Sequence, residues 1–253
     1  MADAPPFFWG LAGLGLGIFG FIIGLKSLFM RRLIENIPTS KVRSIAMGLV
    51  EVYGQVIPVK VLKSPFSSKD CVYFKYQIEE LRSDGKHSRW VTIKKEERFE
   101  PFLLKDETGQ VLVDCKEANV DIKLDNRYES GIGHKPPQQV YDFLEKNGIA
   151  YGGFLGINRH MRYTEWFVAP GDRLYVMGTA ADNPRVKLAS KGTENIMIQK
   201  GEDEKIFYVS DRSEKEILSS LRWKILLGIF GGAALTVGSL AFLIFGMQAG
   251  ILF

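Results

Sequence analysis

Cysteine and histidine are scarce in this chain: its 253 residues contain two cysteines and three histidines. A disulfide-stapled fold is therefore excluded, and so is any module that fills two tetrahedral zinc sites, which needs eight Cys and His ligands. No C-x-x-C spacing is present. We expect Cys71 and Cys115 to be two buried thiols in a reducing compartment. A bond between them becomes plausible only in an oxidising one.

Charge is missing from both ends of the chain. Apart from Asp3, every Lys, Arg, Asp and Glu lies between Lys26 and Lys224. The uncharged stretches 7–25 and 225–253 are each about as long as the ~20 apolar residues with which a helix crosses a bilayer. The first stretch lacks a basic segment before it and is closed by Lys26, Arg31 and Arg32. It therefore reads as a retained span and not as a cleaved signal peptide.

The basic residues that flank the spans predict an orientation. All of them lie on the inner side of the sequence, after the first span or at Arg222 and Lys224 before the second, whereas the two tails carry none. The positive-inside rule then places the central domain in the cytoplasm and both termini outside. Trp9 and Trp223 occupy positions where interfacial aromatic residues are expected.

About 200 residues remain between the spans, enough for one ordinary domain, and neither a repeat nor a Pro/Ser-rich linker divides them. The formal net charge of the chain is +4, and because Asp3 lies outside this region the domain itself carries about +5. This surplus suits an anionic membrane surface. It is too small and too dispersed to indicate a nucleic-acid partner.

Short strands with turn residues between them dominate the central region. Residues 72–79 alternate apolar and polar side chains, and Asp84-Gly85 marks a turn before a second strand around 90–93. Further strands are predicted at 102–105, 110–114 and 120–125. Two hairpins are predicted, 163–168 with 173–177 across Gly171, and 196–199 with 206–209 across Gly201. This spacing predicts a small barrel or sandwich.

Two helices interrupt the strands. Pro136-Pro137 opens one that ends at a Gly148 cap, with Lys146 in its last turn. Ser213 and Glu216 have the spacing of a capping box, from which a helix is predicted to continue without a break into the second span. The domain is thus expected to join the membrane through a stiff helical rod.

Three stretches carry a family resemblance: TSKVRSIAMGLVEVYGQV, RYTEWFVAPGDRLYVMG and IFYVSDRSEKEILSSLRWKILLGIFGG. Together with the order of span, domain and span, they resemble the GIDE or BAM ("beside a membrane") region of the MULAN/MAPL mitochondrial ubiquitin ligases and their prokaryotic relatives. The resemblance runs from about Pro38 into the second span. The residues that fall in the family's order are Tyr163, Glu165, Gly171, Asp172, Tyr175 and Gly178.

The resemblance implies a noncatalytic membrane module. In the ligases, a RING domain after the second span recruits the ubiquitin-charged enzyme, and the present region is thought to mediate partner contacts and assembly. This sequence ends at Phe253, inside or just past the span, and its five Cys and His residues cannot supply the eight ligands of a RING. In the mitochondrial ligases the domain faces the intermembrane space. The charges that flank the spans differ in this sequence, so we do not assign the compartment of the mitochondrial ligases to this domain.

Glycine motifs in the spans favour packing over nucleotide binding. The segment 15–20 matches G-x-G-x-x-G, but it lies inside a span with no strand before it. Pairs of glycines four residues apart allow helices to approach closely, within one chain or in a homo-oligomer, although membrane helices are rich in glycine generally. The candidate packing residues are Gly13, Gly17, Gly20, Gly24, Gly228 and Gly232.

One candidate partner-binding group lies in the central domain: Arg162, Tyr163, Glu165 and Trp166. A Trp and a Tyr near basic residues are typical of an interface with a peptide or a lipid head group. The alternative, which we prefer, is that the aromatic residues fill the barrel and Gly171-Asp172 makes a hairpin. His87 and His160 stand beside Lys and Arg and are expected to be solvated loop residues. We nominate no catalytic, cofactor-binding or metal-binding residue.

The sequence as a whole predicts a mostly β domain, a small barrel or sandwich with one or two helices, between two transmembrane helices. Its predicted parts are a tail 1–6, a first span with its extension 7–35, a β-rich domain 39–209, a juxtamembrane helix 213–224, a second span 225–247 and a tail 248–253. The expected function is a noncatalytic scaffold or sensor that binds a protein partner or lipid beside the bilayer. The alternative is ligase-like activity with a RING from another chain. A membrane hydrolase would need a nucleophile and base pair that the sequence does not offer.

Overall fold

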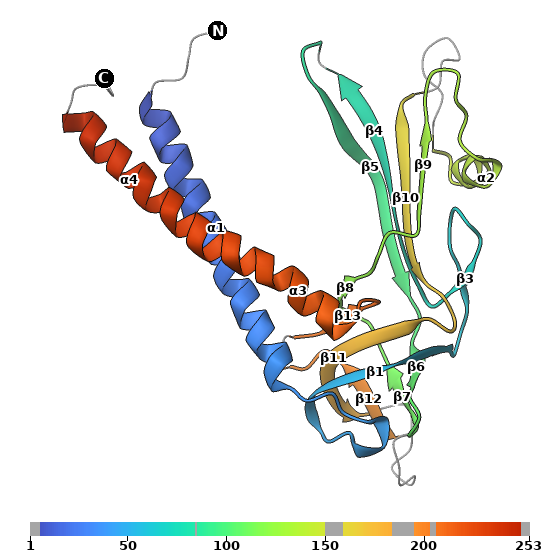
Figure 1. The fold of residues 1–253 in the computed structure, drawn as a ribbon. Coiled ribbons are helices and arrows are strands. Elements are labelled where there is room, and N and C mark those ends of the chain that lie inside the picture. Colours follow the sequence, from blue (N-terminus) through green and yellow to red (C-terminus); the bar gives the residue numbers. More distant parts are fainter. Residues whose placement is uncertain (1–5, 84, 150–158, 184–194, 203–205, 249–253) are drawn as a thin grey trace. The chain divides into compact units, whose positions relative to one another are not determined.

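The computed structural model describes residues 6–83, 85–149, 159–183, 195–202 and 206–248. The chain divides into two compact units, one formed by the segments up to Pro38 and from Ser213 onward, the other by Thr39–Arg212. Figure 1 shows the elements of each. The first unit is helical and the second is built almost entirely of strands.

The helical unit contains two helical stretches, 7–36 and 214–248, that are long and apolar enough to cross a membrane. The first is helix α1 (Pro6–Asn36), and the second consists of α3 (Glu214–Ile225), a π-helical segment (Leu226–Gly231) and α4 (Gly232–Gln248). The capping box is present, since Ser213 Oγ accepts from Glu216 N and the Glu216 carboxylate accepts from Ser213 N. The predicted continuous rod is therefore helical throughout, but it contains a π segment that periodicity did not indicate.

Glycines allow α1 and the second helical stretch to approach to backbone contact. A Cβ on Gly228 would lie 2.6 Å from Gly24 Cα, and one on Gly17 would lie 2.7 Å from Thr236 N. A Cβ on Gly232 would meet Phe21 N at 2.6 Å, whereas one on Gly20 would still have 3.7 Å to Gly232 Cα. The structure thus places the six predicted packing glycines along a contact within one chain. A homo-oligomer through the spans stays a prediction.

The β unit begins with a short 3₁₀ turn (Val42–Ser44) and contains a closed barrel. Its strands are β1 (Gly48–Pro58), β6 (Phe102–Lys105), β7 (Gln110–Val113), β12 (Ile196–Gln199) and β11 (Arg173–Asp182), in that spatial order, and β11 pairs again with β1. All neighbours are antiparallel except β7 and β12. This is the strand order of the OB-fold, a five-stranded Greek-key barrel. Two short strands, β8 (Asn119–Asp121) and β13 (Tyr208–Ser210), extend the sheet beside β11.

Two insertions in the barrel form a second sheet. The segment between β1 and β6 supplies the small hairpin β2 (Leu62–Lys63) and β3 (Asp70–Cys71), then β4 (Tyr73–Ser83) and β5 (Ser88–Phe99). The segment between β7 and β11 supplies β9 (Asn126–Ser130), α2 (Gln138–Lys146) and β10 (Met161–Val168). Strands from both insertions pair in the order β5-β4-β10-β9. We call this four-stranded sheet the inserted sheet.

The apolar cores of barrel and inserted sheet are distinct and meet at one row. Val72, Tyr73 and Val168 belong to the barrel core, whereas Phe74 and Phe167, the next residues along β4 and β10, belong to the core of the inserted sheet. Helix α2 covers that second core with Val140 and Leu144. Its ends agree with the sequence prediction, since Pro137 precedes it and Gly148 follows it with φ +62°.

The two hairpins predicted across Gly171 and Gly201 are wrong in their pairing. Strands β10 and β11 lie in different sheets, because Gly171 N donates to Val56 O and Val56 N donates to Asp172 O, which directs β11 along β1. Strands β12 and β13 both pair with β11 and not with each other. Strands β1, β2, β3 and β9 were not predicted, and the strand expected over 120–125 is limited to β8.

A disulfide test addresses the contact between the helices. The Cβ of a residue at position 13 lies 3.4 Å from Ser239 Cβ, close to the separation in disulfides. We expect Gly13→Cys with Ser239→Cys to form an intrachain disulfide in oxidised membranes, visible as a mobility shift of the monomer. Gly228→Leu should reduce the yield severalfold, whereas Gly231→Leu should not, because nothing lies within 4 Å of its Cβ. A product linked only between chains would contradict the contact.

Candidate functional site

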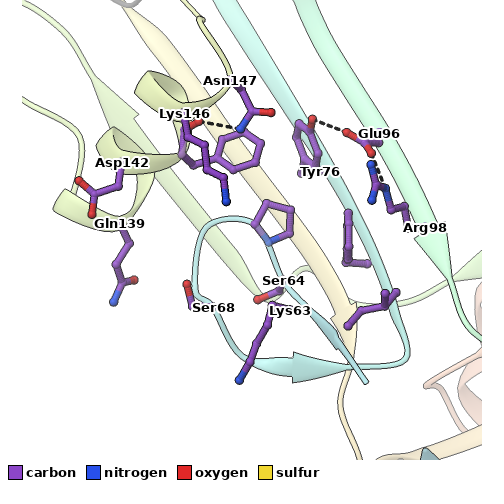
Figure 2. Close-up of a pocket in the computed structure, with 14 residues that line it drawn as sticks. Lys63, Ser64, Ser68, Tyr76, Glu96, Arg98, Gln139, Asp142, Lys146 and Asn147 are labelled. Carbon is purple, nitrogen blue, oxygen red and sulfur yellow. Dashed lines mark hydrogen bonds and ion pairs between the residues drawn. The ribbon is translucent and has the colours of Figure 1, made fainter. Parts of the chain in front are cut away.

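A cavity of about 530 Å³ opens on the face of the inserted sheet that α2 covers. The β2–β3 hairpin forms one wall, α2 a second, and β4 and β5 the third (Figure 2). The volume lies in the range of protein sites for small ligands and single side chains. Its lining residues come from three regions of the sequence, 62–76, 96–98 and 139–147, so the tertiary fold is needed to assemble it.

The floor of this cavity is aromatic. Tyr76 and Phe143, which line it, are 5.2 Å apart between ring centroids in an edge-to-face arrangement. Phe66, fully buried behind them, contacts both rings at 5.4 and 5.2 Å. Such edge-to-face contacts stabilise by ~1 kcal/mol each beyond the area they bury. The floor is therefore rigid, and Phe143 remains partly accessible.

One wall of the cavity carries a fixed charge network. The Tyr76 hydroxyl donates to Glu96 Oε2 at 2.8 Å, and Arg98 Nε donates to Glu96 Oε1 at 2.5 Å. The Tyr76 hydrogen bond holds the pKa of Glu96 below its usual range, helped by Arg98 and opposed by partial burial. Burial, followed by the Glu96 carboxylate, raises the pKa of Tyr76. At neutral pH this wall therefore presents an ionised Glu96, a neutral phenol and a cation.

The other two walls, formed by the β2–β3 hairpin and by α2, each carry a lysine. Lys63 pairs with Asp70 at 2.5 Å, and Asp142 accepts from Gln138 at 2.7 Å. Lys146, in the last turn of α2, is exposed and makes no hydrogen bond or ion pair with a described residue. Figure 2 shows its side chain directed toward the β2–β3 loop. Lys146 is thus the charge on the rim that is available to an incoming acidic group.

Glu165 fastens the β2–β3 loop to the inserted sheet. Its side chain is fully buried, and it accepts from Phe66 N at 2.7 Å and from Asn126 Nδ2 at 3.1 Å. Tyr163, two residues earlier, is also fully buried and hydrogen-bonds Ser130. Both side chains lie behind the aromatic floor. A direct contact with a partner is not open to either of them in this conformation.

Arg162 and Trp166 lie on the other face of the same sheet. The Arg162 guanidinium stacks 3.8 Å from the Trp90 ring and pairs with Glu79 and Glu129. Trp166 is partly exposed beneath Lys75, 5.5 Å from its ring. The structure thus divides the four predicted partner-binding residues between two faces. A binding role for Arg162 and Trp166 stays a prediction.

The cavity residues were missed by reasoning from the sequence. The only signals in it are the turn-rich stretch Ser64 to Ser68 and the apolar stripe of α2, and both are typical of ordinary surface structure. The residues that line the cavity are Leu62, Lys63, Ser64, Pro65, Ser68, Phe74, Tyr76, Glu96, Arg98, Gln139, Asp142, Phe143, Lys146 and Asn147.

The two thiols and two of the histidines lie outside this cavity. Burial raises the pKa of Cys71 to about 12, with Glu165 and Asp70 adding to the shift, and burial likewise raises that of Cys115. Both thiols are buried and free, and His87 and His160 are exposed. Among the residues that the structure describes, no group of three or more His, Cys, Asp or Glu side chains is placed to hold a metal.

Comparison with family models matches residues 74–244 to the family described as GIDE, E3 ubiquitin ligase. The chain belongs to the GIDE family. Searches among curated proteins and among solved structures found no match. In this GIDE chain the matched region begins at β4, includes the inserted sheet and most of the barrel, and ends inside α4.

The GIDE match therefore covers the cavity's sheet and helix walls, from Phe74 to Asn147, and leaves the β2–β3 hairpin outside. It includes the capping box of α3 and the second helical stretch as well. Within the sequence given, five Cys and His residues are present where a RING uses eight.

Replacing Glu165 tests whether it holds the loop in place. Glu165→Leu leaves the Phe66 amide and the Asn126 amide without their buried acceptor, so we expect the free energy of unfolding to fall by about 3 kcal/mol. Glu129→Leu, on the opposite face, removes the ion pairs of an exposed carboxylate with Arg127 and Arg162 and should change the free energy of unfolding by less than ~1 kcal/mol. Chemical denaturation of the full chain in detergent, followed by labelling of Cys71, measures both. Equal stability of the two variants would contradict the structural role.

Proposed function

We propose that this GIDE chain is a noncatalytic, membrane-anchored binding module whose cavity holds a segment of a protein partner. The observation that carries the proposal is the cavity itself, with an aromatic floor and an unpaired Lys146 at its rim. Aromatic residues with a few placed charges are what protein recognition sites use to anchor a partner.

The chemistry of the walls defines the partner segment. Glu96 is already satisfied by Tyr76 and Arg98, so it has little need of a cation. Lys146 has no carboxylate partner among the described residues, and a rim cation of this kind attracts an acidic group. The partner segment therefore carries an apolar or aromatic side chain that packs against the aromatic floor. An Asp or Glu of the same segment follows it and lies near Lys146 at the end of α2.

The membrane spans give this module its location. Both helical stretches are long and apolar enough to cross a bilayer, and the basic residues beside them lie on the side of the domain. We place the domain in the cytoplasm and both termini outside, by the positive-inside rule. Labelling of Lys86→Cys by an impermeant thiol reagent in intact cells would contradict this orientation. Cys71 and Cys115 are buried and give no background.

The alternative function is ligase-like activity in which another chain supplies the RING. The family description, E3 ubiquitin ligase, favours it. In that case the cavity would hold either the substrate or the chain with the RING, and the present chain would act as the membrane receptor of the assembly. The same binding site serves both functions, and they differ in whether transfer of ubiquitin accompanies binding.

Photo-crosslinking tests the cavity as the partner site. Gln139 lines the cavity, whereas the adjacent Gln138 does not. We expect benzoylphenylalanine in place of Gln139 to crosslink a discrete partner in membranes, and the same group in place of Gln138 to do so at least tenfold less. Lys146→Glu should lower the Gln139 yield by about tenfold, because like charges then face each other. Equal yields at both positions, or no effect of Lys146→Glu, would contradict the proposal.

A further inference from the structure

The inserted sheet has a free end far from the barrel. Its last complete row is Glu80, Met161 and Ser130, paired across β4, β10 and β9. Beyond this row lie the β4–β5 turn, the loop after β9 and the residues before β10, and Figure 1 shows the two turns at the same end of the sheet. We call the described residues 82–83, 85–89, 131–135 and 159–160 the distal tip. The cavity does not include any of them.

A tight turn holds a large apolar side chain out at this tip. Gly131 and His134 exchange two backbone hydrogen bonds of 2.9 and 3.0 Å, and Gly133 has φ +72°, which favours glycine. Between them Ile132 is 72% exposed, the highest fraction among the large apolar residues described in the β unit. A closed turn cannot fold this side chain back onto the sheet. The Ile132 side chain therefore stays exposed to water unless another surface covers it.

Among the described residues, the tip also carries more cations than the neighbouring Glu80 neutralises. Glu80 is shared by Arg82 at 2.7 Å and Arg159 at 3.0 Å, and these cations hold its pKa below the usual range. Lys86, Arg89 and Lys135 are exposed and make no ion pair with a described residue.

Two of these cations face each other. Arg82 and Arg89 are directly opposite across β4 and β5. Like charges in that position destabilise a strand pair, so this placement does not serve the stability of the hairpin.

We infer that the distal tip is a docking surface for an anionic phospholipid bilayer. Lys86, Arg89 and Lys135 supply attraction to the lipid phosphates, and Ile132 enters the interface between head groups and acyl chains. Trp90, stacked on Arg162 just behind the β5 side of the tip, has the amphipathic ring that is enriched at that depth. Two helical stretches of the chain are long and apolar enough to span a membrane, so a bilayer is the partner surface that the chain itself indicates.

Vesicle binding by the full chain tests this inference. The protein is placed in nanodiscs of zwitterionic lipid, and vesicles of phosphatidylcholine with or without 30 mol% phosphatidylserine are added and floated. We expect recovery with the anionic vesicles only, and weaker recovery at high salt. Each tip cation replaced by glutamine should weaken binding about fivefold, and Lys86→Gln, Arg89→Gln and Lys135→Gln together about a hundredfold. Ile132→Ser should weaken it about tenfold without changing net charge.

A matched triple variant controls for net charge. Arg43, Lys105 and Lys116 are exposed cations of the barrel and its loops, and their replacement by glutamine removes the same charge elsewhere. This control should bind within about twofold of wild type, and protection of Cys71 from labelling confirms that every variant is folded. Equal losses in both triple variants would overturn the tip as the surface. Competition by polyglutamate as strong as that by anionic vesicles would assign the tip to acidic protein instead and overturn the lipid.

Discussion

The pairing of β1 with β11 is the constraint on which the β unit depends. It joins Gly48–Gln55 to Arg173–Ala180 and closes the barrel, although about 120 residues of chain separate the two strands. Closure removes the free edges of the barrel and buries its valine-rich interior. Because β1 and β11 bracket both insertions, their pairing also fixes where β4 leaves the barrel and where β10 returns. The inserted sheet is therefore positioned by the barrel and stabilised by its own separate core.

Within that sheet, one buried carboxylate connects the structural core with the cavity. Glu165 lies on β10 but holds the backbone of Phe66, whose ring supports Tyr76 and Phe143 in the cavity floor. Polar groups at this depth are costly unless satisfied, and Glu165 is satisfied by a backbone amide and Asn126. A residue that resembles a binding residue by composition thus contributes indirectly, since it shapes the loop that forms one wall.

The sequence predicted the features that depend on local composition. It did not predict which strands pair when they are far apart in the chain. The spans followed from uncharged runs, the capping box from Ser213 and Glu216, and α2 from its Pro and Gly boundaries. The Gly171 turn was recognised too, but turn chemistry does not say which strand its neighbours pair with, and Val56 of β1 takes the hydrogen bonds that a hairpin would use. The cavity likewise depends on long-range packing, because α2 must come to lie against β4, β5 and the β2–β3 hairpin. No local sequence pattern around Lys63, Tyr76, Glu96 or Lys146 indicates this cavity.

The family to which the chain belongs is described as E3 ubiquitin ligase, whereas we propose a noncatalytic binding module, and no group of three or more His, Cys, Asp or Glu side chains among the described residues is placed to hold a metal. The measurement that separates these directly is ubiquitin discharge from a charged conjugating enzyme by the purified full chain in nanodiscs, with its zinc content measured on the same sample. Our account predicts discharge no faster than that of the enzyme alone and zinc far below one ion per chain. Stimulated discharge by the pure chain would contradict the noncatalytic binding module.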